Sequence, residues 1–201
     1  MLFQDAFLLA NKNFPDGGTC LEFGVSIGNT YMWQAEQILT EFKNNKLIGF
    51  DSWEGLPEES KNVWYPDRHS IGAFAYPKEL VEARLKVLLN DIPDERFQFV
   101  DGFFSESLTG ELQKQIDDVI FINIDVDIHK STIELLVFVK PFLRSGVIIY
   151  WDDWLDPQDV SEKHGSWGEH LAWEEWSKEN PEIKTKTIKV NEWNQRIMEV
   201  L

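Results

Sequence analysis

The stretch Leu21-Glu-Phe-Gly-Val-Ser-Ile-Gly28 decides the fold. It begins inside residues 19–23, which are a candidate strand, and it ends in a loop with two glycines spaced four residues apart. Glycine lets the backbone turn sharply and approach a ligand closely. Because Asn29 can cap a helix running to about Phe42, the loop also feeds a helix N-terminus, which favours a negatively charged ligand group. The pattern G-x-x-x-G is common, and it lacks the full G-x-G-x-x-G of dinucleotide sites.

Outward from this loop, apolar runs alternate with amphipathic stretches along the chain. Further strands are predicted at 47–50, 97–100, 119–124 and 147–150, and helices at 2–10, 77–90, 107–115, 131–143 and 167–179. Residues 184–190 and 196–201 alternate like an antiparallel pair. Five strand–helix steps followed by such a pair predict an α/β fold with a doubly wound, mostly parallel sheet and an antiparallel edge.

The length of 201 residues predicts one domain spanning 1–201. Within it, residues 1–18 are expected to form a short helix and a turn. Residues 52–76 are expected to form one long loop, and loops of that length in compact domains are often functional.

The composition excludes several classes of protein. The 35 acidic and 19 basic residues give a net charge of −16, which argues against binding to nucleic-acid backbones or anionic membranes. The one cysteine, Cys20, excludes an intramolecular disulfide framework and is expected to be buried in the first strand. The apolar runs are too short to span a bilayer, and Asp5 makes the first residues unlike a secretory signal. We therefore expect a soluble, cytoplasmic protein.

Acidic side chains mark the carboxyl end of every predicted parallel strand, where α/β sheets bind their ligands. They are Glu22, Asp51, Asp101, Asp125 and the pair Asp152 and Asp153. Any one of them alone is explained equally well as a helix cap. Asp51 lies 27 residues after Gly24, and an acid there can accept both ribose hydroxyls of a nucleoside cofactor.

Three of these acids, Asp125, Asp152 and Asp153, follow two strands that are expected to be neighbours. Converging carboxylates repel one another, and a hard divalent cation such as Mg²⁺, Mn²⁺ or Ca²⁺ relieves that repulsion. The nearby Asp127 and His129 are candidates for ligands, for neighbours of ligands or for capping groups of the helix predicted at 131–143.

Five strings along the chain resemble class I S-adenosylmethionine-dependent methyltransferases. More narrowly they resemble the macrocin O-methyltransferase family, which methylates sugar hydroxyls on macrolides. Besides the opening stretch they are Gly49-Phe-Asp-Ser-Trp-Glu-Gly-Leu-Pro57, Asp101-Gly-Phe-Phe-Ser-Glu-Ser-Leu108, Ile124-Asp-Val-Asp-Ile-His-Lys-Ser-Thr132 and Ser145-Gly-Val-Ile-Ile-Tyr-Trp-Asp-Asp153. The resemblance covers roughly residues 19 to 155.

The resemblance implies a Rossmann-like, mostly parallel seven-stranded sheet with an antiparallel last strand and helices on both faces. It also implies an S-adenosylmethionine site. Glu22, Gly24, Ser26 and Gly28 would lie near the methionine, and Asp51 and Ser52 near the ribose. Asp101 and Gly102 would lie near the adenine, and Asp125 would also contact the cofactor. It also implies Mg²⁺ held by Asp125, Asp152 and Asp153. His69 is the nearest match to the family's proposed base, with His129 and Asp127 as alternatives. The expected catalytic residues are therefore His69, Asp125 and Asp127.

Three departures from the family pattern leave the acceptor open. Fewer residues precede Glu22 than in family members, so the lid over the site is expected to be reduced or supplied by a second subunit of a homodimer. Val126 stands where the family has glycine between the two acids of Asp-x-Asp, and His129 stands where it has an aromatic residue.

The nine tryptophans are expected to serve two purposes. Trp33, Trp173 and Trp176 have helical spacing typical of core residues. Trp151, Trp154 and Trp167 flank the acids and are candidates for an apolar wall against a sugar or aromatic acceptor, and Trp53 and Trp64 for a cover over the cofactor.

Together these patterns predict a Mg²⁺-assisted O-methyltransferase that acts on a hydroxyl of a sugar-containing or other small molecule. A metal-dependent hydrolase is an alternative, but it leaves the glycine loop and Asp51 unused. A nicotinamide enzyme fits the incomplete glycine pattern poorly. A non-catalytic cofactor-binding protein of the same fold remains a third alternative.

Overall fold

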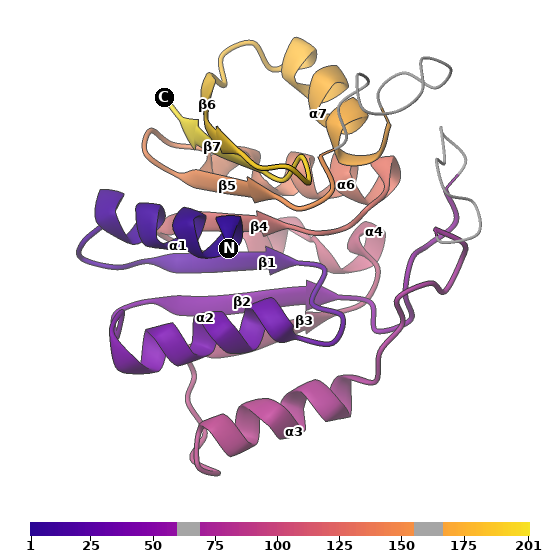
Figure 1. Ribbon diagram of the computed structural model, residues 1–201. Helices are drawn as coiled ribbons and strands as arrows, with labels where there is room; N and C mark the ends of the chain where they lie inside the picture. The colour runs from indigo at the N-terminus through magenta and orange to yellow at the C-terminus, as the bar shows by residue number, and fades with distance from the viewer. Residues whose placement is uncertain (60–68, 155–166) are drawn as a thin grey trace.

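The computed structural model describes residues 1–59, 69–154 and 167–201 and contains a seven-stranded sheet of order β3-β2-β1-β4-β5-β7-β6 (Figure 1). The strands are β1 Thr19–Phe23, β2 Lys46–Asp51, β3 Phe97–Asp101, β4 Val119–Ile124, β5 Ile148–Trp151, β6 Thr185–Val190 and β7 Arg196–Val200. The pairs among β1 to β5 are parallel, whereas β7 runs antiparallel to both β5 and β6. The predicted sheet, with its reversed last strand, is confirmed.

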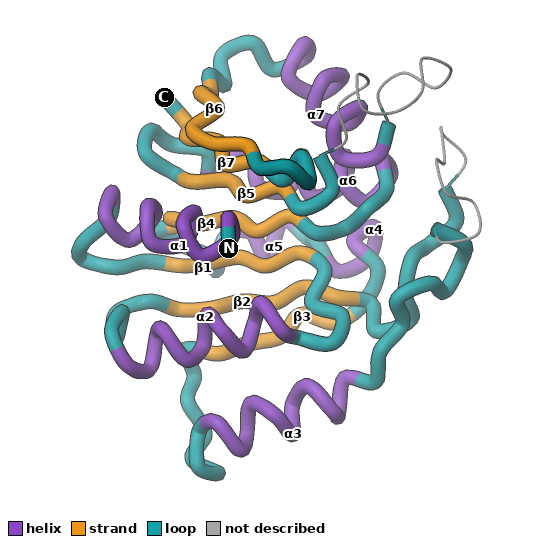
Figure 2. The backbone as a smooth tube through the Cα atoms, in the orientation of Figure 1, coloured by secondary structure: helices purple, strands orange, loops and turns teal. Residues whose placement is uncertain are grey.

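Helices cover both faces of this sheet, as predicted (Figures 1 and 2). They are α1 Leu2–Asn13, α2 Asn29–Thr40, α3 Lys78–Leu88, α4 Phe104–Ser107, α5 Gly110–Gln113, α6 His129–Val139 and α7 Gly168–Glu179. In the view of Figure 1, α1 and α2 lie in front of the sheet, and α6 lies behind it beside α7. No helix within the described ranges has both the length and the apolar character that crossing a bilayer would require.

The core has two halves because successive residues of a strand point to opposite faces of the sheet. Cys20 and Leu47 pack toward α1 and α2, and their neighbours Leu21 and Ile48 pack toward α6 and α7. The middle strand β4 is buried along its whole length. Burying each large apolar side chain contributes about 1.5–3 kcal/mol, so this strand anchors the sheet.

Two predicted helices differ in detail. Where one helix was expected at 107–115, α4 ends at Ser107 and the shorter α5 begins at Gly110. Thr109 caps α5, because its Oγ1 accepts a hydrogen bond from the Leu112 backbone N–H at 3.2 Å. The helix expected at 131–143 begins earlier, at His129, and becomes a 3₁₀ turn at Lys140–Phe142. Pro141 lies in that turn and has no backbone N–H to continue the α-helical pattern.

The register of the sheet brings the strand ends to one edge. Phe23 pairs with Phe50 on one side and with Ile124 on the other, and Ile124 pairs with Trp151. The residues that follow these positions therefore converge at the carboxyl edge of the parallel strands.

Candidate functional site

A cavity of about 390 Å³ opens at this carboxyl edge. Its lining comes from the loops after β1, β2, β3, β4 and β5, together with Leu56, Pro57, Ala73 and Phe74 of the long loop. The volume falls in the range typical of small-molecule sites. Of the residues predicted to bind the cofactor, Gly24, Ser26, Asp51, Ser52, Gly102 and Asp125 line it.

The glycine loop is held in place by the carboxylate of Asp51. Its Oδ2 accepts hydrogen bonds from the backbone N–H groups of Val25 and Ser26, each at 2.8 Å, and its Oδ1 accepts one from the Trp53 backbone at 2.7 Å. Asp51 also lines the cavity, so one carboxylate both shapes the loop and faces the ligand space. The loop-shaping contact was missed from sequence because it depends on β1 and β2 being neighbours.

Gly24 is required by close packing at the end of β1. Its φ of +85° lies in the left-handed region, and a Cβ on it would come within 1.7 Å of the Asp125 backbone oxygen. Only glycine fits there, and the loop that follows β1 therefore lies directly against the loop that follows β4.

Glu22 lies beneath the cavity rather than on its wall. It is completely buried, and its carboxylate accepts hydrogen bonds from Thr30 Oγ1 at 2.7 Å and from the Gln34 amide. Burial raises the pKa of Glu22 to about 8, although the hydrogen bonds from Thr30 and Gln34 oppose the shift. Since Thr30 lines the cavity, Glu22 supports a wall residue from behind.

Asp101, the residue expected near the adenine, lies just outside the cavity lining. Its Oδ1 accepts a hydrogen bond from Trp53 Nε1 at 2.9 Å, and its Oδ2 accepts one from Lys78 Nζ at 2.7 Å. The adjacent Gly102 does line the cavity, as does Ser52, whose hydroxyl donates to the Gly55 backbone oxygen at 2.9 Å.

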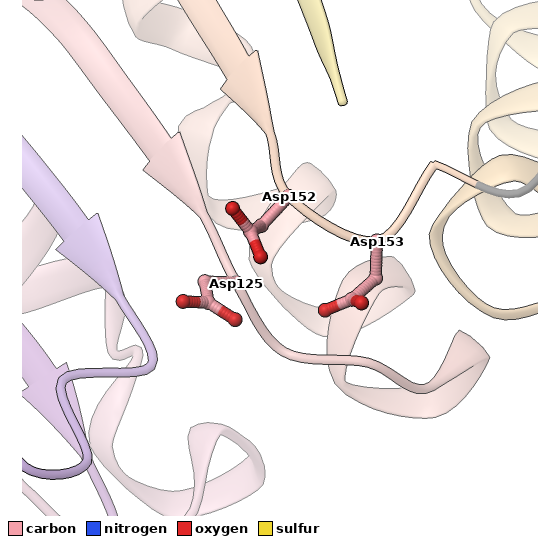
Figure 3. Close-up of side chains that lie close together, drawn as sticks. All are labelled: Asp125, Asp152 and Asp153. Carbon is pink, nitrogen blue, oxygen red and sulfur yellow. The ribbon is translucent and has the colours of Figure 1, made fainter. Parts of the chain in front are cut away.

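Asp125, Asp152 and Asp153 meet at the other end of the cavity, where β4 and β5 end (Figure 3). Each offers a carboxylate oxygen, and these three atoms lie within 4.8 Å of one another. Burial, and next the charge of Asp152, raises the pKa of Asp125 well above its usual value, and burial raises that of Asp152. Among the described residues that line the cavity, none is a lysine or an arginine. An all-oxygen set of this kind fits a hard divalent cation.

A fourth acid, Glu169 of α7, holds the two acid-bearing loops together. It is completely buried, and its two oxygens accept hydrogen bonds from the backbone N–H groups of Val126 at 3.0 Å and Asp153 at 3.2 Å. Burial, and next the charge of Asp153, raises the pKa of Glu169 well above its usual value. Sequence analysis missed it because an acid in the first turn of a helix is ordinary and its partners lie far away in the chain.

The predicted base residues are partly brought together. His69 Nε2 lies 3.4 Å from Asp127 Oδ1, and both side chains are largely buried. Asp127 lines the cavity, whereas His69 lies behind it, with its ring stacked on Trp167 at 6.2 Å between centroids. The capping role weighed for Asp127 is wrong, since the N-cap of α6 is Ile128 and the Lys130 backbone N–H in the first turn donates to Glu59 Oε2 at 2.7 Å.

His129 points to a different neighbour. Its Nε2 lies 2.7 Å from Glu175 Oε2 of α7, and His129 is absent from the described lining of the cavity. This contact joins α6 to α7, so His129 is placed for packing rather than for proton transfer.

The tryptophans near the acids lie in the core. Trp151 and Trp154 are buried against each other, with ring centroids 5.1 Å apart, so the predicted acceptor wall is wrong for these two. Trp173 and Trp176 are core residues, as predicted, and Trp33 packs against the core. Trp53 is bound to Asp101 at the edge of the site, and Trp64 lies outside the described residues.

Comparisons with known proteins agree with this geometry. Residues 21–154 match a family described as a methyltransferase domain. A curated relative from Streptomyces olivaceus, named 8-demethyl-8-(2,3-dimethoxy-alpha-L-rhamnosyl)-tetracenomycin-C 4'-O-methyltransferase, is 28% identical over 109 residues. The alignment covers 52% of this chain and only 40% of that relative.

Solved structures share the fold across nearly the whole chain. The O-methyltransferase NovP superposes with a TM-score of 0.74 at 18% identity, covering 98% of this chain and 78% of its own. The calicheamicin methyltransferase CalS11 superposes with a TM-score of 0.69 at 21% identity, covering 98% and 77% respectively.

Proposed function

The chain belongs to the methyltransferase domain family, and on that premise we propose that it is an S-adenosylmethionine-dependent O-methyltransferase. We further propose that its acceptor is a hydroxyl of a sugar-containing or other small molecule and that a divalent cation assists the reaction. One observation carries this proposal. A single cavity joins the Asp51-held glycine loop to the cluster of Asp125, Asp152 and Asp153.

The two ends of the cavity have separate tasks in this proposal. When bound, S-adenosylmethionine supplies the methyl group, and the cation supplies positive charge that favours loss of the acceptor's proton. The chain's residues bind and orient the reactants. Asp51 would face the ribose hydroxyls while holding the loop, and the three clustered carboxylates would hold the cation. Holding an acceptor oxygen in line with the methyl group makes the transfer effectively unimolecular, which can lower the barrier by about 7–11 kcal/mol.

Asp127 and His69 form the group that removes the proton. Asp127 lies on the cavity wall, within reach of an acceptor, and His69 lies 3.4 Å behind it. The pair can therefore take a proton at Asp127 Oδ1 or share it with His69 Nε2, as general-base catalysis requires.

The acceptor class rests on the relatives and on the cavity walls. The Streptomyces relative is named for methylation of a rhamnosyl-bearing compound. Beside the acids, Leu56, Phe74 and Phe103 provide apolar wall area, which suits a molecule that combines hydroxyls with carbon rings.

Calorimetric titration with S-adenosylhomocysteine tests the cofactor site. We expect binding by the wild type and a loss of about 100-fold or more in Asp51→Ala, because the substitution removes a charged acceptor worth about 1.5–3 kcal/mol per hydrogen bond. Asp117→Ala is the matched control, because Asp117 is 72% exposed and lies far from the cavity.

Two results would count against the proposal. Wild-type protein that does not bind S-adenosylhomocysteine would refute the methyltransferase assignment. Unchanged affinity in Asp51→Ala would refute the role given to that carboxylate. The hydrolase alternative finds no support among the relatives, which are methyltransferases by name.

A further inference from the structure

The turn between β6 and β7, residues 191–195, lies at the same edge of the sheet as the acid cluster. Because β7 runs antiparallel to β5, its first residue, Arg196, pairs with Trp151, the last residue of β5. Gln195 therefore lies beside Asp152, and its Nε2 donates a hydrogen bond to Asp152 Oδ1 at 2.7 Å. Neither Gln195 nor this turn belongs to the motifs that predicted the site.

The orientation of the Gln195 amide is fixed by Asn191. The Oδ1 of Asn191 accepts backbone N–H groups from Trp193 at 3.0 Å and from Gln195 at 3.1 Å, which closes the turn. The Nδ2 of Asn191 must then point away from those donors, and it donates to Gln195 Oε1 at 2.8 Å. Since an amide has its oxygen on one side and its NH₂ on the other, the Gln195 NH₂ is left facing Asp152.

Asp152 receives both of its described hydrogen bonds on the same oxygen. Tyr150 Oη donates to Oδ1 at 2.8 Å and Gln195 Nε2 donates to it at 2.7 Å. Two donors on Oδ1 fix the plane of the carboxylate and leave Oδ2 as the oxygen for another ligand. Partners of this kind orient metal ligands, and losing one typically weakens metal binding 10- to 100-fold.

We propose that Asn191 and Gln195 form an amide relay that positions Asp152 for the cation site. The relay rests on the proposed function, because it matters only if a cation binds Asp125, Asp152 and Asp153. Both residues act through Asp152, so they are positioning residues and do not touch the acceptor.

The test is calorimetric titration of Mn²⁺ into the wild type and two variants. Gln195→Met removes the donor while nearly keeping the size of the side chain. Asn191→Asp keeps an oxygen to close the turn, but it replaces the NH₂ that faces Gln195 Oε1 with an oxygen. We expect each variant to bind Mn²⁺ 10- to 100-fold more weakly than the wild type, with unchanged affinity for S-adenosylhomocysteine.

Asn191→Asp separates the relay from a simple charge effect. The substitution adds a negative charge near the cluster, and by Coulomb's law alone that charge would strengthen cation binding. An oxygen at position 191 would attract the Gln195 NH₂ and turn the Gln195 oxygen toward Asp152. Weaker Mn²⁺ binding would therefore come from this reversed amide. The double variant is expected to bind no more weakly than Gln195→Met, because both changes break one chain of hydrogen bonds.

Gln98→Met is the control for a glutamine-to-methionine change. Gln98 lies on β3, where its Nε2 donates to the Glu95 backbone oxygen at 2.9 Å, so this variant should bind Mn²⁺ as the wild type does. Wild-type affinity in both Gln195→Met and Asn191→Asp would overturn the relay alone. Wild-type protein that binds S-adenosylhomocysteine but no Mn²⁺ would overturn the cation part of the proposed function, and the relay with it.

Discussion

Glu22 is one of the buried acids whose protonation the fold changes. Its carboxyl group is completely buried beneath the cofactor loop, and burial raises its pKa from 4.5 to about 8. The folded protein therefore holds Glu22 protonated at neutral pH. A protonated carboxyl can donate to an amide oxygen, and among the described residues Gln34 Oε1 is buried without a partner. Rotation of the Gln34 amide would let it receive that proton.

The first prediction concerns the pH dependence of stability. Because the pKa of Glu22 is higher in the folded state, unfolding releases a proton between about pH 4.5 and 8. Over that range Glu22 lowers the free energy of unfolding by up to about 1.4 kcal/mol per pH unit as the pH rises. Urea denaturation at several pH values should show a flatter profile for Glu22→Gln than for the wild type. The surface variant Glu111→Gln should keep the wild-type profile, and parallel curves for all three would contradict the prediction.

Single residues also show which members of the site could be predicted from the sequence and which could not. Asp51, Asp125, Asp152 and Asp153 could be found because they directly follow apolar runs that form neighbouring strands. Glu169 could not, because its partners are backbone N–H groups on two loops that only the finished fold brings to α7.

At the scale of elements, the loops after β1 and β4 are in direct contact through Gly24. The Asp125 backbone oxygen occupies the place of a side chain at that glycine. The cofactor loop and the acid cluster are therefore built as one unit, although 100 residues lie between Gly24 and Asp125 along the chain.

Gly24→Ala tests this contact against a matched glycine. Gly24 and Gly102 both have positive φ, +85° and +110°, so alanine strains the backbone at either position. A Cβ on Gly24 would overlap the Asp125 oxygen, whereas one on Gly102 would approach nothing nearer than 3.7 Å. Thermal denaturation should show Gly24→Ala losing at least about 2 kcal/mol more than Gly102→Ala, as expected for overpacking in a close-packed interior. Equal losses would mean that the two loops separate easily.

The strands were predicted more closely than the short helices. Strands such as β4 are nearly all apolar, and their ends coincide with the first charged residue. The 107–115 segment has amphipathic spacing, but Thr109 offers its hydroxyl as a cap and divides it. A helix of that length has little intrinsic stability, so one cap is enough to decide where it begins.

At the scale of the whole molecule, the net charge of −16 destabilises the folded state, because like charges repel one another when the chain is compact. The acids are not spread evenly, since five aspartates line the cavity and Glu169 lies behind them. Added salt screens repulsion between exposed charges over roughly 10 Å at 0.1 M, but it screens buried charges much less. A cation bound at the cluster would reduce the repulsion among the buried carboxylates.

Magnesium should therefore stabilise the protein beyond its effect as a salt. We expect MgCl₂ to raise the melting temperature more than NaCl of equal ionic strength. The extra gain should be roughly 5–10 °C at Mg²⁺ concentrations about 100 times its dissociation constant. Asp153→Asn should remove the extra gain while leaving the response to NaCl intact. Identical melting temperatures in the two salts for the wild type would count against a cation at the cluster.

The position of β7 has a consequence for the order in which the molecule is assembled. On the ribosome, residues 185–190 emerge before 196–200, yet β6 reaches the sheet only through β7. Until β7 is inserted, β5 keeps an open edge, which invites pairing with another nascent chain. Asp152 also lacks its hydrogen bond from Gln195 until then, because Gln195 directly precedes β7. The hydrogen bonds of the acid cluster are therefore complete only after β7 has been synthesised and has paired with β5. A cation site at the cluster would form only once the sheet has all its strands.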